Sequence, residues 1–388
     1  MESRQSFRPE VRRALPWMVT FRFLINVVVR MTYTFLPAFA RGTGMSVESM
    51  SRVLSARELT SLTAPMSGSA ADRHGTTRIM TWSGIVVLAG ISLSLFGGPA
   101  FVVGMLIFGV GRTAYQVSQQ AWVGDEVAYE RRGRATGLIE LSWGGTTLVG
   151  LPLVGLLIDG FSWRAPFIVL AVACVPVLVG LHRQQSSKGE HRRPVRSKLT
   201  FTRPVIGALA VNGAMTGAAQ FLFLGHGLWL EDTYDLNPAE VGFAVIAVGV
   251  VEVVATLGSA RMTDSLGKRT SMLGGGALMT VTLVALALFP SPPLAAGLFL
   301  LVLAFLGFEY AIVSAIPLMA ELAPDNRARM IAVGLTVSTV SRAVITLAAT
   351  AIYIEWGFAT LMTVASAFGA AAVLLTLTVM VEPTTGSD

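Results

Sequence analysis

The sequence predicts an all-α membrane protein with many spans, and three observations support this fold class. Of its 388 residues, 53% are hydrophobic and 13% are charged, whereas soluble domains carry about 25% charged residues. Apolar runs of about twenty residues, each long enough to cross the hydrocarbon core of a bilayer, recur along the chain. These runs are continuous, unlike the alternating strands of a membrane β-barrel. We therefore expect each run to form a transmembrane helix.

Turn residues and charged clusters divide the chain into twelve candidate spans. The basic N-terminal residues precede an apolar run that is too long for the core of a secretory signal, so we expect no cleaved signal sequence. The expected spans are residues 15–40, 47–67, 77–97, 99–122, 134–159, 164–182, 205–230, 238–260, 270–289, 293–318, 328–354 and 357–380.

The loops between these spans alternate in charge, since even-numbered loops are basic and odd-numbered loops are neutral or acidic. Lys and Arg stay on the cytoplasmic side of a membrane, so both termini are expected in the cytoplasm. The basic residues thus indicate topology and contact with lipid, with no nucleic-acid partner. The alanine-rich, lysine-poor composition favours a GC-rich bacterium and its inner (plasma) membrane.

The two halves of the chain are related by a repeat, which predicts two pseudo-symmetric six-helix bundles. Transporters are often built from such repeats. We expect an N-terminal bundle over residues 1–183, a cytoplasmic linker over 184–203 and a C-terminal bundle over 204–388. The matched landmarks lie 192 to 195 residues apart: Asp72 and Gly75 with Asp264 and Gly267, residues 126–134 with 321–329, and Trp163 with Trp356.

Two motifs in the first half give a resemblance to a known family. Residues 68–78 fit the pattern G-x-x-x-D-R-x-G-x-x-R, and "GRTAYQ" at 111–116 is centred on Arg112. Together with the span count and the repeat, these motifs resemble the major facilitator superfamily over essentially the whole chain. The resemblance implies that family's twelve-helix fold, with a substrate pathway between the bundles. Within this superfamily, the sequence resembles the branch of efflux proteins that work as proton antiporters.

In the resembled family, the first motif is a cytoplasmic latch that favours the outward-facing state. The resemblance implies that Asp72 contacts the start of the eleventh helix, and that Arg73 or Arg78 pairs with Asp125 or Glu126. A hydrated loop that only sets topology is the alternative. The expected latch residues are Gly68, Asp72, Arg73, Gly75, Arg78, Asp125, Glu126 and Arg134, with Asp264, Gly267, Lys268 and Arg269 in the second half.

Nine charged residues lie well within the expected spans, away from their ends. Each would cost about 2.5–3.5 kcal/mol at the centre of a bilayer, so most must face a cavity or one another. The third, sixth, ninth and twelfth spans have no interior charge, which matches the peripheral helices of the resembled fold. The nine residues are Arg22, Arg30, Arg57, Glu58, Arg112, Glu140, Glu252, Glu309 and Arg342.

Polar stripes on two helices predict a substrate cavity, with hydrogen bonds between helices as the alternative. Arg57 and Glu58 are consecutive and so point about 100° apart, which leaves open which of the two faces the cavity. The candidate cavity residues are Arg22, Asn26, Arg30, Tyr33, Arg57, Arg112, Gln116, Gln119, Gln120, Tyr310 and Arg342.

Four acidic residues are candidates for proton coupling, in the order Glu309, Glu252, Glu58 and Glu140. An apolar cavity favours the neutral form of a carboxyl group, which lets it exchange a proton near neutral pH. The repeat is expected to place Glu309 at the position in the second half that corresponds to Gln116 in the first. A structural partner for Arg112 or Arg342 is the alternative role.

These features predict a secondary active transporter that works as a monomer by alternating access. The segment "GTTLVGLPLVG" (145–155) resembles an antiporter motif and favours proton-coupled export of a small organic or amphipathic molecule. Uptake or exchange of an anionic metabolite is the alternative, and a sensor or scaffold without transport is a minor one. The scattered histidines form no metal motif, so we expect no enzymatic activity, metal or cofactor.

Overall fold

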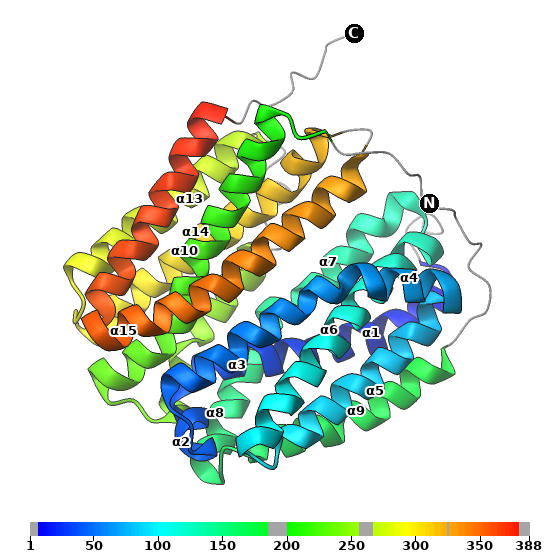
Figure 1. The fold of residues 1–388 in the computed structure, drawn as a ribbon, viewed down its shortest axis with the longest axis horizontal. Coiled ribbons are helices and arrows are strands. Elements are labelled where there is room, and N and C mark those ends of the chain that lie inside the picture. The colour runs from blue at the N-terminus through cyan, green and yellow to red at the C-terminus, as the bar shows by residue number, and fades with distance from the viewer. Residues whose placement is uncertain (1–6, 185–199, 256–266, 324–325, 380–388) are drawn as a thin grey trace. The chain divides into compact units, whose positions relative to one another are not determined.

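The computed structural model describes residues 7–184, 200–255, 267–323 and 326–379. The chain divides into two compact units, Met1–Arg193 (unit 1) and Pro194–Asp388 (unit 2). Every regular element in the described ranges is a helix (Figure 1). Ten of these helices are long and apolar enough to cross a membrane. The predicted all-α fold of a membrane protein is therefore confirmed.

Unit 1 forms the first six expected spans, and three of those spans consist of consecutive helical segments. The segments follow one another along nearly the same path (Figure 1). The elements are α1 (Pro9–Thr34), α2 (Leu36–Thr43), α3 (Val47–Leu59), η2 (Thr60–Thr63), α4 (Ala64–His74), α5 (Thr76–Ser94), α6 (Gly98–Glu126), α7 (Tyr129–Gly145), η3 (Thr146–Gly150), α8 (Leu151–Gly160) and α9 (Ala165–Arg183).

Prolines account for the interruptions in the first, second and fifth spans. Pro37, Pro65 and Pro152 each lie in the first turn of the segment that follows the break. Proline cannot donate to the preceding turn and clashes with it, but it fits the start of a helix. In the fifth span the break is a π-helical turn, η3, which ends at Gly150.

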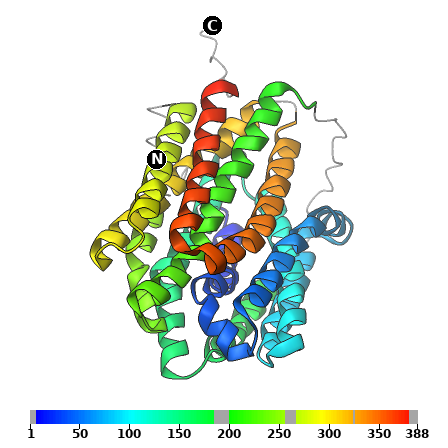
Figure 2. The same cartoon turned by 60° about the vertical axis from the view of Figure 1, so that its left-hand side comes forward.

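Unit 2 contains the remaining spans. One long helix, α15, has a non-helical backbone at Gly357 (φ 77°, ψ −178°). Its two arms, orange and red in Figures 1 and 2, run in different directions and are the expected eleventh and twelfth spans. Residues 256–260 of the expected eighth span lie outside the described residues. The elements are α10 (Arg203–Tyr234), α11 (Pro238–Ala244) with a further helix over 246–255, α13 (Lys268–Leu288), α14 (Leu294–Glu321) and α15 (Arg327–Val379).

The repeated turn has the same backbone conformation in both units. Gly75 precedes α5 with φ 91° and ψ 138°, and Gly267 precedes α13 with φ 84° and ψ 146°. Side chains make such positive φ angles unfavourable, so glycine is required at both turns. Asp264, the second copy of Asp72, lies outside the described residues.

Glycines also let the same pair of helices pack backbone to backbone in both units. A Cβ atom added to Gly111 of α6 would lie 2.8 Å from the backbone nitrogen of Val87 in α5. A Cβ atom added to Gly307 of α14 would lie 2.6 Å from the backbone nitrogen of Met279 in α13. Small residues permit this close approach of membrane helices.

These contacts correct one detail of the expected repeat. Val87 and Met279 are 192 residues apart, whereas Gly111 and Gly307 are 196 apart. The offset therefore grows by four residues between the two helices of each pair. At the offset of 196, Glu309 corresponds to Thr113 and not to Gln116.

Gly275 provides a test of the close packing in unit 2. A Cβ atom there would lie 2.6 Å from the carbonyl oxygen of Gly307, whereas one on the adjacent Gly274 would meet nothing within 4 Å. We expect Gly275→Ala to cost about 1–3 kcal/mol of stability because the helices must separate. Gly274→Ala should leave stability unchanged or raise it slightly, because alanine favours helices. Thermal unfolding of the purified protein in detergent measures both, and equal midpoints would contradict the packing.

Candidate functional site

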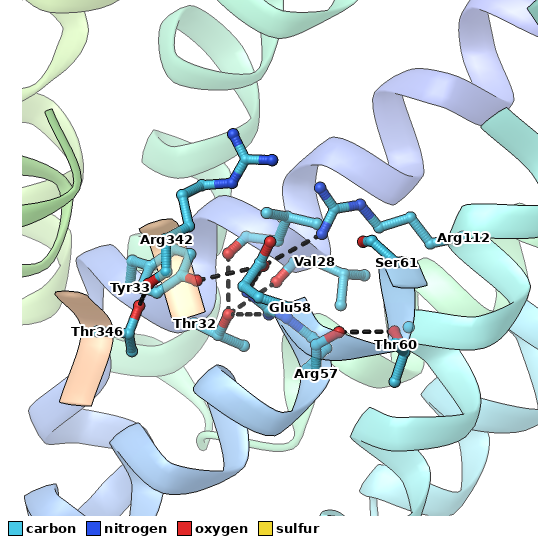
Figure 3. A network of polar contacts seen from close by, with 12 residues as sticks. Val28, Thr32, Tyr33, Arg57, Glu58, Thr60, Ser61, Arg112, Arg342 and Thr346 are labelled. Atoms are coloured by element: carbon cyan, nitrogen blue, oxygen red, sulfur yellow. Dashed lines mark hydrogen bonds and ion pairs between the residues drawn. The ribbon is translucent and has the colours of Figure 1, made fainter. Parts of the chain in front are cut away.

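A buried cluster of charged side chains joins α1, α3 and α6 inside unit 1 (Figure 3). Its centre is one carboxylate oxygen, Oε1 of Glu58. This oxygen accepts hydrogen bonds from Arg57 Nη2 at 3.0 Å, Arg112 Nη1 at 3.2 Å and Tyr33 Oη at 3.2 Å. Two guanidinium groups and one carboxylate give the cluster a formal charge of about +1.

Arg57 is the inner arginine of the cluster, with 0% of its surface exposed. Its Nη1 donates to Thr32 Oγ1 at 2.6 Å, and the Thr32 hydroxyl donates in turn to the carbonyl oxygen of Val29 at 2.8 Å. The guanidinium carbon lies 5.1 Å from the ring centroid of Tyr33. Arg57 is thus held by a hydroxyl group, an aromatic ring and a carboxylate.

Arg112 is the outer arginine, with 9% of its surface exposed. It reaches Glu58 from α6, while Arg57 and Glu58 both belong to α3. The sequence prediction that Arg57 and Glu58 point apart is wrong for the ends of their side chains. Both side chains are long enough to bend toward each other and form an ion pair at 3.0 Å.

Four predicted cavity residues lie on α1, namely Arg22, Asn26, Arg30 and Tyr33, and two of them contact α7. Asn26 Nδ2 donates to Ser142 Oγ at 3.0 Å. The guanidinium carbon of Arg30 lies 4.7 Å from the ring centroid of Trp143, in a cation–π contact. Sequence reasoning missed both partners, because serine and tryptophan at these positions carry no charge to mark them.

Tyr33 contacts Glu58 of α3, and Arg22 contacts α6. In the amide orientation that satisfies both groups, the side-chain oxygen of Gln116 accepts hydrogen bonds from the guanidinium of Arg22. Gln119 Nε2 donates to the carbonyl oxygen of Met18 at 3.4 Å. Gln120, in contrast, is exposed. Among these polar residues, α1 and α6 are thus joined by Arg22 with Gln116 and by Gln119 with the backbone of Met18.

The four candidate proton carriers lie in different surroundings. Glu58 is 1% exposed, and in unit 2 Glu252 is 0% and Glu309 is 6% exposed. Glu140 is an exposed residue of α7. Three of the four carboxyl groups are therefore buried within apolar spans.

Unit 2 contains a row of neutral polar side chains between α10 and α15. Asn212 Nδ2 donates to Ser338 Oγ at 2.7 Å, and Gln220 Nε2 donates to Thr346 Oγ1 at 2.9 Å. The half-buried Arg342 lies in the same row of α15, midway between these two partners. Sequence reasoning followed charge and missed the row, although its four-residue spacing on both helices was a signal for it.

Tyr310 belongs to a separate contact in unit 2. Its hydroxyl lies 3.1 Å from Ser271 Oγ, which connects α14 to α13. Within the described ranges, no group of three His, Cys, Asp or Glu side chains could hold a metal ion.

The expected latch residues lie at the ends of helices. Asp72, Arg73 and Arg78 are exposed around the Gly75 turn, with Gly68 in α4 before them. At the end of α6, Asp125 is exposed and Glu126 is half-buried, and Arg134 follows in α7.

In unit 2, Lys268 forms an ion pair with Glu321, joining the start of α13 to the end of α14. Arg269 Nη2 donates to the carbonyl oxygen of Leu377 at 2.9 Å. Sequence reasoning did not single out Glu321, although the repeat places it at the position of Glu126.

Comparison with known proteins identifies the family. The sequence pattern of the Major Facilitator Superfamily matches residues 18–230 and 209–388. The chain belongs to the Major Facilitator Superfamily. Its fold is that of a multi-pass integral membrane protein in a family of transporters.

Individual relatives agree with this family. The chain is 26% identical over 245 residues to the "uncharacterized MFS-type transporter YceJ" of Bacillus subtilis (strain 168), a match that covers 59% of this chain and 61% of that protein. It is 34% identical over 98 residues to the lysophospholipid transporter LplT of Cronobacter sakazakii (strain ATCC BAA-894), covering 25% of this chain and 24% of that one. The chain spans 48% to 61% of the length of the first curated relatives that it matches.

A solved structure shares the fold across nearly the whole chain. The crystal structure of the human organic anion transporter MFSD10 (TETRAN) matches with a TM-score of 0.68 at 14% identity. The match covers 95% of this chain and all of that one.

Substitutions of Thr32 test whether its hydroxyl group holds Arg57 in place. Thr32→Val removes the acceptor of Arg57 Nη1 and leaves a buried donor unsatisfied, so we expect a loss of about 1–3 kcal/mol in stability. Thr32→Ser keeps the hydroxyl group and should stay within about 1 kcal/mol of the wild type. Thermal unfolding in detergent measures both variants. If valine is tolerated as well as serine, Thr32 does not hold Arg57.

Proposed function

We propose that the protein is a monomeric secondary active transporter of the plasma membrane, with cytoplasmic termini, that works by alternating access. It exports a small organic or amphipathic molecule in exchange for protons. Membership of a transporter family supports transport as such. The carboxyl groups buried within the spans are the observation that supports proton coupling, since ionisable groups in a membrane are expensive and usually functional.

Glu309 is the first candidate for the proton carrier. It is 6% exposed, it follows Phe308 in α14, and Phe305 lies one turn before it on the same face. Burial away from water favours the neutral form of a carboxyl group. Glu58 is less suited because two guanidinium groups stabilise its charged form. Glu252 ranks second, and the exposed Glu140 ranks last.

Exchange or uptake of an anionic metabolite is the second candidate function. The observation in its favour is the excess of arginine inside unit 1, where Arg22, Arg30, Arg57 and Arg112 accompany the buried Glu58. Arginine binds carboxylate and phosphate groups through paired hydrogen bonds. Arg112 is the arginine that we expect to meet such an anion, because it is the more accessible member of the Glu58 cluster.

Transport in everted membrane vesicles distinguishes these two functions. A pH gradient is imposed and followed with a pH-sensitive dye while cationic, neutral and anionic compounds are added in turn. For proton-coupled export, cationic or neutral compounds should dissipate the gradient in the wild type, and Glu309→Gln should reduce the initial rate at least about tenfold. Glu355→Gln, the same change at an exposed position of α15, is the matched control.

A response to anions alone would contradict export of a cationic or neutral molecule. In that case Arg112→Gln should abolish the response, because a neutral amide replaces the guanidinium. Unchanged transport in Glu309→Gln would remove Glu309 from the proton path and make Glu252 the next residue to test.

We also propose that the motif at the end of α4 is the cytoplasmic latch implied by the family. Asp72→Asn removes a charge from it, so we expect the initial transport rate to fall at least about tenfold at unchanged protein levels. Asp159→Asn, at the exposed end of α8, is the control. Equal transport rates in the two variants would contradict the latch and would indicate that the motif only sets the topology of the chain. The proposed latch residues are Gly68, Asp72, Arg73, Gly75, Arg78, Asp125, Glu126 and Arg134, with Asp264, Gly267, Lys268 and Arg269 in unit 2.

A further inference from the structure

His226 of α10 is a buried titratable residue to which the proposed proton path gives no role. It is 3% exposed and belongs to a helix that is long and apolar enough to cross a membrane. Ionisable groups inside membrane helices are costly and usually functional. The contacts of this imidazole therefore indicate whether it serves the same path as Glu309.

The hydrogen bond of the ring fixes which nitrogen can gain a proton. Nδ1 of His226 lies 3.0 Å from the carbonyl oxygen of Leu222, one turn earlier on α10. A carbonyl oxygen only accepts hydrogen bonds, so Nδ1 carries a hydrogen and donates it. In the neutral ring, Nε2 then has the lone pair. Nε2 can therefore take up and release a proton while Nδ1 stays bonded to the helix.

Aromatic contacts join this part of α10 to the part of α14 that carries Glu309. The ring of His226 meets Phe305 edge to face, with the centroids 5.9 Å apart. One turn earlier on α10, Phe223 meets Phe305 at 5.1 Å and Phe308 at 5.7 Å. Glu309 follows Phe308 directly and lies one turn after Phe305. The phenylalanine that touches His226 is therefore one helical turn from Glu309.

The directions of the two helices bring the ends of the two side chains toward each other. Later residues of α10 meet earlier residues of α14, so these helices run in opposite directions. Long side chains lean toward the N-terminus of their helix, and the bond from His226 to Leu222 shows this lean directly. The same tendency in α14 directs Glu309 toward the level of His226.

His226 lies nearer than Glu309 to the outer end of unit 2. Trp229, one turn after His226, donates from Nε1 to the carbonyl oxygen of Pro290 at 2.8 Å. Pro290 belongs to the connection between α13 and α14, which the proposed orientation places outside the membrane. Glu309 lies about four turns into α14 from that connection. On a path from the external solution, His226 therefore comes before Glu309.

Two other charged groups of neighbouring helices lie away from the imidazole. Arg342 of α15 lies level with the middle of α10, about three turns before His226. At the outer end, Tyr353 of α15 donates to Asp232 at 2.8 Å. Glu309 is thus the group that adjoins the aromatic contacts of His226. Further titratable residues of these elements are Glu231 and Tyr234 on α10, Glu240 on α11, Tyr310 on α14 and Glu355 on α15, with Glu252 on the helix over 246–255.

We propose that His226 is a proton relay between the external solution and Glu309, an inference that rests on the proposed proton-coupled transport. Nε2 takes up a proton from the external side. It gives this proton to the carboxylate of Glu309 through a bridging water molecule or after a rotation of the Glu309 side chain. The ring becomes neutral again, with the lone pair on Nε2, and Glu309 becomes a neutral carboxyl group. The bond from Nδ1 to Leu222 is kept throughout.

The charge that moves across the membrane after a jump in pH tests the relay without a transported substrate. The purified full-length protein is reconstituted in proteoliposomes on a solid-supported electrode, and protons are the only probe. We expect Glu309→Gln to remove most of the displaced charge. His226→Asn keeps a donor for the Leu222 carbonyl but has no basic nitrogen, so the initial rate should fall at least about tenfold. His182→Asn, at the exposed end of α9, should leave the rate unchanged.

The pH profile separates a relay from a purely structural role. In the wild type, the rate should level off at low external pH, because His226 is then fully protonated. In His226→Asn it should keep rising with the proton concentration. Adding His226→Asn to Glu309→Gln should cause no further loss, because both residues serve one path. A fall by the same factor at every pH would assign His226 to packing and overturn the relay.

A second variant keeps the test decisive if asparagine impairs folding. His226→Phe keeps an aromatic ring against Phe305, and it should slow the displacement as His226→Asn does. If the displaced charge depends on Glu309 but on neither His226 variant, the relay is wrong and the proposed proton coupling stands. If the wild type displaces no charge, the proposed proton coupling is wrong, and the relay is wrong with it.

Discussion

One carboxylate oxygen, Oε1 of Glu58, holds three helices of unit 1 in register. Hydrocarbon offers no hydrogen bonds, so every polar group inside a membrane bundle must find its partner on another helix or on its own backbone. The donors that meet at this oxygen come from α1, α3 and α6. Sliding any one of these helices by a single turn would leave a buried guanidinium or phenol group without its hydrogen bond to this oxygen. The polar interior of unit 1 therefore depends on the geometry around this one atom.

The two units share their packing but not their polar chemistry. Both use a glycine with positive φ between their second and third spans, and both use a glycine to bring the third and fourth spans together. Both also join their first and fifth spans through an Asn–Ser hydrogen bond, Asn26–Ser142 in one and Asn212–Ser338 in the other. Around these shared contacts, unit 1 buries arginines against Glu58, whereas unit 2 joins α10 to α15 through amides and hydroxyl groups and buries the carboxyl groups of Glu252 and Glu309. The repeat thus preserved backbone contacts while side chains diverged.

Features that depend on local sequence could be predicted well. Hydropathy located the spans. The repeat predicted equivalent turns at Gly75 and Gly267, because a backbone with positive φ requires glycine at both positions. The helix breaks at Pro37, Pro65 and Pro152 could also have been predicted, because proline interrupts the helical turn that immediately precedes it.

Partners across helices could not be predicted in the same way. Whether Arg30 meets Trp143 depends on how α1 rotates against α7, and no sequence spacing encodes that angle. The predicted correspondence between Glu309 and Gln116 in the repeat was wrong for a different reason. The repeat offset changes between one helix and the next, so a landmark in a loop does not fix the alignment of a distant span.

The π-helical turn at Thr146–Gly150 has a consequence for how this protein tolerates changes in chain length. Such a turn holds one residue more than an α-helical turn, so all of α8 is rotated by about 100° relative to an uninterrupted helix. Deleting a single residue within the turn would restore a regular helix and present a different face of α8 to its neighbours. Gly150 would also move away from Val27, whose side chain would lie 2.7 Å from a Cβ atom at that glycine. In this span, residue count matters as much as residue identity, and relatives that differ here by one insertion or deletion would expose different side chains from nearly identical sequences.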